Sequence, residues 1–236
     1  MFDGKSILIV DHDSARRHFL AARLGNAGHR VVEAIGNSAA LAALDSGAYA
    51  LVLVGLASED SIALAHAIRD DGGEDAIVPI LAFNGPASDA IAERMFAAGI
   101  DGHISGTATP EALLSALQPW LTDDDPEAER RGRMAAMFGR AAFDGLLAGL
   151  AQQLAEALAM LGGDGEQACA HRIAGLAGTL GFADVAASWL RLSLGDGTAR
   201  RRARLMAVRA LRAIGRERAI GRERAAAFDQ PSVRSR

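Results

Sequence analysis

Short apolar runs alternate with helical stretches through the first 121 residues, and this alternation limits the possible folds more than any other feature. The runs are SILIV (6–10), VVEAI (31–35), ALVLVGL (50–56), IVPILAF (77–83) and GHISG (102–106). Apolar residues recur at helical spacing between and after them, over 14–27, 38–44, 61–69, 87–98 and 110–121. Unbroken apolar strands are buried on both faces, and such connections form right-handed crossovers. The pattern predicts a doubly wound α/β domain over residues 1–121, with a parallel sheet of five strands.

The chain changes character after residue 121. The acidic segment TDDDPE (122–127) comes next, and beyond it the strand patterns vanish and Ala, Leu and Arg dominate. Residues 1–125 hold 7 basic and 18 acidic side chains, whereas residues 126–236 hold 18 and 11, so the halves carry net charges of about −11 and +7. We therefore predict two domains joined by an acidic linker over 122–131.

The second half has only helical patterns. We expect one long helix over 134–160, with a break near Gly139, and further helices over 164–180, 184–192 and 198–214. Four helices with short connections favour a four-helix bundle over 132–214. Residues 213–224 repeat the hexapeptide AIGRER, whose glycines weaken a continued helix. We therefore expect 215–236 to form a mobile, arginine-rich tail.

Composition also bears on the cellular environment. Cys169 is the single cysteine, so neither an internal disulfide nor a cysteine-based zinc site can form. No stretch approaches the roughly 20 consecutive apolar residues of a membrane span. We expect a soluble, cytoplasmic protein without membrane contact.

His171 is the only histidine of the second half. At about 100° per residue, the apolar positions 169, 173, 176 and 180 fall roughly opposite it, between about 140° and 200°. Gln167, Gly175 and Gly178 fall within about 60° of it. A glycine inside a helix costs roughly 1 kcal/mol relative to alanine. The two glycines therefore suggest that another protein approaches an exposed imidazole closely.

The first half resembles the receiver domain of bacterial response regulators over residues 5–121, in its order of elements and in the segments ILIVDHD, PILAFNG and GIDGHISG. In that family an aspartate ending the third strand accepts the phosphoryl group, and two acids after the first strand hold magnesium. A hydroxyl ends the fourth strand, and a lysine ends the fifth. The corresponding residues here are Asp11, His12, Gly55, Asn84 and Gly106, of which only Asp11 matches.

This degenerate site should not be phosphorylated, because aspartyl phosphorylation needs a carboxylate nucleophile, a divalent cation and a further cation together. Gly55 offers no nucleophile. Glu59 or Asp60 could in principle replace it, but Lys5, the only lysine, precedes the first strand. We expect no metal site here and interpret Asp11 and Asp13 as solvated loop carboxylates or helix caps, with weak cation binding as the minor alternative.

The segment AHRIAGLAGTLGF (170–182) resembles the signature of histidine-phosphotransfer domains, in which His-x-(Leu/Ile)-x-Gly precedes small residues and Leu-Gly. The resemblance implies a phosphoryl carrier at His171, with Gln167, Arg172, Gly175 and Gly178 near the phosphoryl group or the partner. The family's usual lysine three residues after the histidine is Ala174 here. Arg172 or Gln167 would then donate hydrogen bonds in its place.

The two resemblances together imply an intermediate of a two-component phosphorelay. It would exchange phosphoryl groups between His171 and the aspartates of receivers in a hybrid kinase or a response regulator, as a carrier more than a turnover enzyme. It would need no cofactor of its own, because the partner receiver supplies magnesium. The alternatives are a non-phosphorylated adaptor that binds receivers and, less favoured, a DNA-binding regulator, since no reading helix or stacking aromatic residue accompanies the arginines. The first domain could also serve homodimerisation.

Overall fold

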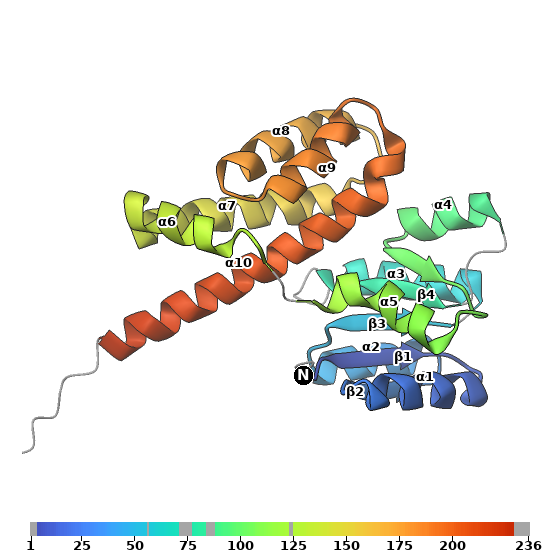
Figure 1. The fold of residues 1–236 in the computed structure, drawn as a ribbon. Coiled ribbons are helices and arrows are strands. Elements are labelled where there is room, and N and C mark those ends of the chain that lie inside the picture. Colours follow the sequence, from blue (N-terminus) through green and yellow to red (C-terminus); the bar gives the residue numbers. More distant parts are fainter. Residues whose placement is uncertain (1–3, 56, 71–76, 84–87, 123–124, 229–236) are drawn as a thin grey trace, which may run out of the picture. The chain divides into compact units, whose positions relative to one another are not determined.

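The structure, a computed structural model, describes residues 4–55, 57–70, 77–83, 88–122 and 125–228 (Figure 1). Of Ser58 and of residues 221–228 it describes the backbone alone. The chain divides into two compact units, Met1–Thr122 and Asp123–Arg236. We call them the sheet unit and the helical unit and describe each by itself.

The sheet unit alternates strands and helices in the predicted order. Its strands are β1 (Ser6–Val10), β2 (Arg30–Ala34), β3 (Leu51–Val54), β4 (Ile80–Phe83) and β5 (Gly102–Ile104). Its helices are α1 (Ser14–Asn26), α2 (Gly36–Ser46), α3 (Ser58–Asp70), α4 (Asp89–Ala97) and α5 (Pro110–Leu121). All neighbouring strands are parallel, in the order β2-β1-β3-β4-β5. The predicted doubly wound sheet is therefore confirmed, with its topological switch point between β1 and β3.

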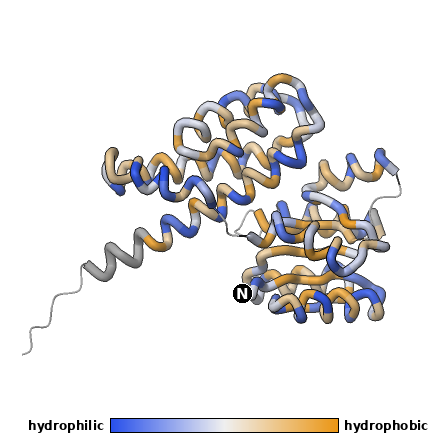
Figure 2. The backbone as a smooth tube through the Cα atoms, in the orientation of Figure 1, coloured by the Kyte–Doolittle hydropathy of each residue, from blue (hydrophilic) through white to orange (hydrophobic). Residues whose placement is uncertain are grey.

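The two central strands explain why the sheet forms. Every residue of β3 and the last four residues of β1 are fully buried, as expected of strands covered by helices on both faces. Leu8 and Val10 of β1 pack in one core cluster with Leu44 of α2 and Leu64 of α3. Figure 2 shows the same pattern, with apolar colour along the strands and mixed colour along the helices.

Strand register determines what lies at the carboxyl edge of the sheet. Val10 pairs with Val54, and the backbone N–H of Gly55 donates to the Val10 carbonyl at 2.8 Å. The next residues, Asp11 and Gly55, are therefore direct neighbours. Doubly wound folds bind ligands at this edge, beyond the switch point.

The described part of the helical unit contains helices and connecting turns without a strand. Its elements are α6 (Ala128–Phe138), α7 (Arg140–Ala159), α8 (Glu166–Thr179), α9 (Ala183–Ser193), a 3₁₀ turn (Gly197–Ala199) and α10 (Arg200–Phe228). Helices α7 and α9 each pack against both α8 and α10, and α6 packs on α7. The all-α fold is confirmed, with α7 to α10 as the four helices around the core. Trp189 is buried there and donates to the Ala203 carbonyl at 3.1 Å.

The break expected near Gly139 is present, whereas two other boundaries differ from the sequence-based expectations. The long helix divides into α6 and α7 at Gly139, which adopts φ +85°, a conformation that glycine accepts easily. Helix α6 begins at Ala128, within the segment expected to be a linker. Helix α10 runs to Phe228, so residues 215–228 are helical where we expected a mobile tail. Ala, Arg and Glu in the repeat favour the helix and outweigh the cost of two glycines.

Among the described residues, no helix is both long and apolar enough to cross a membrane.

Candidate functional site

Helix α8 presents His171 to solvent. The imidazole side is exposed, whereas Cys169, Ile173 and Leu180 on the opposite side of the helix are buried. This orientation agrees with the helical angles calculated from the sequence. Gly181, with φ +80°, follows the helix and turns the chain toward α9. The histidine is therefore an accessible side chain on a well-anchored helix.

The residues expected around His171 divide into two groups. Gln167, Arg172 and Gly175 are exposed, and a Cβ built on Gly175 would meet nothing within 4 Å. Gly178 is half-buried, and a Cβ there would lie 3.4 Å from the Cβ of Ala186 in α9. Gly175 thus leaves the surface open, whereas Gly178 allows close packing of α8 on α9. A contact of Gly178 with a partner protein stays a prediction.

An apolar edge on α9, the helix that packs against the histidine helix, was missed from the sequence. Gly178 lies against Ala186 at one end of α9, and Gly195 lies against Gln167 just beyond its other end. The helices are therefore antiparallel neighbours, with Leu190 and Leu194 one and two turns beyond Ala186. These leucines are 46% and 79% exposed. Helical spacing could have revealed them, since they fall about 100° and 140° from the buried Trp189.

The side chains expected to donate hydrogen bonds near His171 are Gln167 and Arg172, and both are exposed. Position 174, where histidine-phosphotransfer domains usually carry lysine, is a buried alanine. Arg200 pairs with both carboxylate oxygens of Glu166, at 2.8 and 2.9 Å, and this guanidinium holds the pKa of Glu166 below its ordinary value. Arg200 is thus engaged by Glu166, and Gln167 and Arg172 remain the candidate donors.

Arg131 anchors the turn that follows the histidine helix. It is fully buried, ion-paired with Asp125 and, at 2.7 Å, with Glu217 of α10. It also donates to the Gly181 carbonyl at 3.2 Å and stacks over the Phe182 ring at 4.2 Å. Because it joins α6, α10 and the α8–α9 turn, Arg131 fixes the end of the helix that carries His171.

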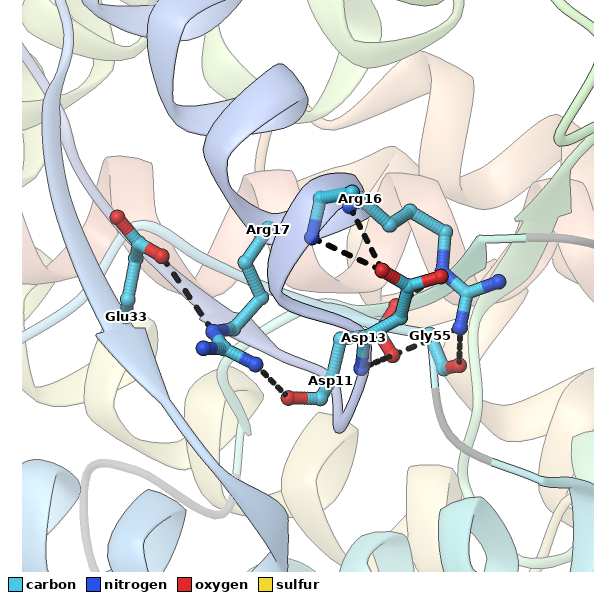
Figure 3. A network of polar contacts seen from close by, with 7 residues as sticks. Asp11, Asp13, Arg16, Arg17, Glu33 and Gly55 are labelled. Atoms are coloured by element: carbon cyan, nitrogen blue, oxygen red, sulfur yellow. Dashed lines mark hydrogen bonds and ion pairs between the residues drawn. The ribbon is translucent and has the colours of Figure 1, made fainter.

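At the carboxyl edge of the sheet unit, Asp11 is buried and paired with Arg16 (Figure 3). Arg16 Nε donates to Asp11 Oδ2, and Arg16 Nη2 donates to Asp11 Oδ1 at 2.8 Å and to the Gly55 carbonyl at 3.2 Å. The hydrogen bond to Asp11 raises the pKa of Arg16. The interpretation of Asp11 as a solvated carboxylate is therefore wrong. Asp13 does cap α1, accepting from the N–H groups of Ala15 and Arg16, and the latter bond lowers its pKa.

The other positions compared with the receiver motif supply no replacement carboxylate where the structure describes them. A Cβ at Gly55 would lie 2.7 Å from Asp11 Cγ, so no side chain fits there without displacement. His12 is exposed, with its imidazole against Gly36, and Gly106 lies in the exposed turn after β5. Asn84 lies outside the described residues. Glu59, one of the two alternative nucleophiles, pairs with Arg94 at 2.9 Å.

The oxygens that the described residues offer a divalent cation at this edge already accept hydrogen bonds from Arg16. Magnesium and calcium prefer several oxygen ligands. Here the Arg16 guanidinium already engages both oxygens of Asp11 and the Gly55 carbonyl. Within the described residues, His, Cys, Asp and Glu form no group of three or more suited to a metal.

No family model matches the sequence, and neither does any curated protein. Solved receiver domains resemble the N-terminal half. The chemotaxis response regulator CheY4 of Vibrio cholerae is 23% identical over 50% of this chain and 99% of its own, with a TM-score of 0.46. The receiver domain of the sensor histidine kinase PA1611 from Pseudomonas aeruginosa was solved with magnesium in its active-site cleft. It is 24% identical over 50% of this chain and 98% of its own, with a TM-score of 0.45. A two-component response regulator from Clostridium difficile is 22% identical over 50% of this chain and 95% of its own, with a TM-score of 0.45.

Proposed function

We propose that this protein carries phosphoryl groups on His171 as an intermediate of a two-component phosphorelay. The observation that carries the proposal is the setting of His171. Its imidazole is exposed on an anchored helix one turn from open Gly175, and the neighbouring helix α9 carries the apolar edge of Leu190 and Leu194. This surface can admit a second protein to the imidazole.

The chemistry needs little from the helical unit beyond a positioned nucleophile. Neutral imidazole is nucleophilic near pH 7. One ring nitrogen attacks the phosphorus of a partner's aspartyl phosphate, a P–N bond forms, and the acyl P–O bond breaks to leave the carboxylate. The partner receiver supplies magnesium and its own cation, and the reverse reaction passes the phosphoryl group to another receiver.

The sheet unit serves this function as a fixed interaction module. Gly55 offers no nucleophile, and Arg16 already donates to both carboxylate oxygens of Asp11 and to the Gly55 carbonyl. A conformational switch requires a ligand that binds two states differently. A site that is not phosphorylated has no phosphoryl group to bind two states differently. The sheet unit therefore acts through its surface, which binds partners or a second copy of the chain.

Phosphoryl transfer from a labelled receiver tests the proposal. Incubation with a phosphorylated receiver and magnesium should move label onto the full chain, and that label should resist alkali and be lost in acid. His171→Ala should remove it. An adaptor that only binds receivers would bind without acquiring label, and label persisting in His171→Ala would refute the assignment.

The apolar edge gives a second expected result. Replacing both Leu190 and Leu194 by arginine should slow labelling of His171 about tenfold or more, because charge at the centre of an apolar contact costs at least roughly 1.4 kcal/mol. Met137→Arg is the matched control, since Met137 of α6 is 81% exposed and Leu194 is 79% exposed. Transfer rates measured with one phosphorylated receiver check this. Equal rates in the double variant and the control would exclude the edge from the contact.

A further inference from the structure

The buried carboxylate of Asp11 must have a cation beside it. Asp11 is 1% exposed. An isolated buried carboxylate is strongly unfavourable unless paired and hydrogen-bonded. Here the backbone N–H of Asp13 donates to Asp11 Oδ1 at 2.9 Å, and Arg16 donates to both oxygens. The carboxylate is therefore satisfied by this chain's own groups.

Arg16 also joins two strands. Its Nη2 reaches the Gly55 carbonyl after β3 while holding Asp11 after β1. The next residue, Arg17, donates to the Asp11 carbonyl at 2.8 Å and lies 3.4 Å from Glu33 of β2. As Figure 3 shows, the first turn of α1 is thus tied to the ends of three strands. These contacts depend on the absence of a side chain at Gly55, because a Cβ there would meet Asp11.

We infer that Arg16 is a permanent internal counter-ion, which takes the place of a divalent cation at the strand ends. It keeps the first turn of α1 and the ends of β1 and β3 in one arrangement. A guanidinium that donates to both oxygens of Asp11 and to the Gly55 carbonyl occupies the position where a divalent cation would bind these groups, and it repels a second cation by Coulomb interaction. The fold and conformation of the sheet unit should therefore be independent of magnesium. This inference stands apart from the role of His171, because all of its contacts lie within the sheet unit.

The first test is cation binding to the full chain, with Mn²⁺ as the probe and the free ion measured by electron paramagnetic resonance. Wild-type protein should show no saturable Mn²⁺ binding at Asp11, so its binding curve should match that of Asp11→Asn. Mg²⁺ should leave the melting temperature of the sheet unit unchanged. Saturable binding of Mn²⁺ that disappears in Asp11→Asn would overturn the inference. This arm needs no variant of Arg16 and holds even if such a variant fails to fold.

The second test is a double-mutant cycle on the full chain by scanning calorimetry, with the transition of the sheet unit assigned by hydrogen exchange of β1 and β3. Arg16→Met should lower the melting temperature of the sheet unit by roughly 5 °C or more, because a buried charge is left unpaired. Asp11→Asn with Arg16→Met should recover most of the loss. Arg23→Met is the control on the same helix, where Arg23 stacks over Phe19 at 5.3 Å. The counter-ion role would be refuted if Arg16→Met lowered the melting temperature no more than Arg23→Met.

Discussion

Replacing Arg131 by methionine should destabilise the helical unit by about 3 kcal/mol, because two partly buried carboxylates and a backbone carbonyl lose their shared hydrogen-bond donor. Arg131 is fully buried and contacts Asp125, Glu217 and the Gly181 carbonyl. Methionine fills much of the volume but donates no hydrogen bond. Since folded domains are stable by only about 5–15 kcal/mol, such a loss is a large part of the total.

Urea unfolding of the full chain, followed by the fluorescence of Trp189 in a Trp120→Phe background, measures this loss. Arg133→Met provides the control on the same helix, since Arg133 pairs with Glu129 one turn away and both side chains are exposed. An exposed pair of this kind contributes about 0.3–0.5 kcal/mol. If the two variants unfolded at the same urea concentration, Arg131 would not anchor the unit.

Restoring an acidic side chain at the end of β3 should damage the sheet unit and leave it chemically inert. A Cβ at position 55 would lie 2.7 Å from Asp11 Cγ, and a carboxylate there would add a second negative charge beside a buried one. We expect Gly55→Asp to cost about 3 kcal/mol or more, from overpacking together with charge repulsion. Acetyl phosphate with magnesium should not add phosphate to the variant.

Alanine separates the steric effect from the charge. Gly55→Ala should be destabilising because its Cβ also meets Asp11, whereas a Cβ at Gly25 in α1 meets nothing within 4 Å. Gly25→Ala should be neutral or stabilising by up to about 1 kcal/mol. Thermal unfolding and intact mass of the three variants provide the comparison. A Gly55→Asp protein that is as stable as wild type and takes up phosphate would show that the site is only one substitution from activity.

The sequence predicted those parts of the fold that depend on local patterns. The unbroken apolar runs of β1 and β3 indicated buried parallel strands, and the angles around His171 indicated an exposed imidazole. The helix over 215–228 was missed because two glycines were weighted above the surrounding Ala, Arg and Glu.

The polar networks could not be predicted because they depend on distant contacts. Arg16 reaches a carbonyl 39 residues away, and Arg131 reaches Gly181 and Glu217 at separations of 50 and 86 residues. From sequence alone, an arginine in a charged segment is predicted to be solvated. Its carboxylate partner becomes evident only once strand register or helix packing is known. The apolar edge of Leu190 and Leu194, in contrast, was accessible from helical spacing alone.

The site of phosphate on the intact protein tests the central claim most directly. The full chain is incubated with a phosphorylated receiver and magnesium, quenched in alkali, digested and sequenced by tandem mass spectrometry without acid. The account predicts phosphate on the peptide that contains His171, none on peptides of the sheet unit, and none anywhere in His171→Ala. Phosphate on an aspartate of the sheet unit, or an unmodified His171 with a receiver that transfers to other histidine carriers, would contradict it.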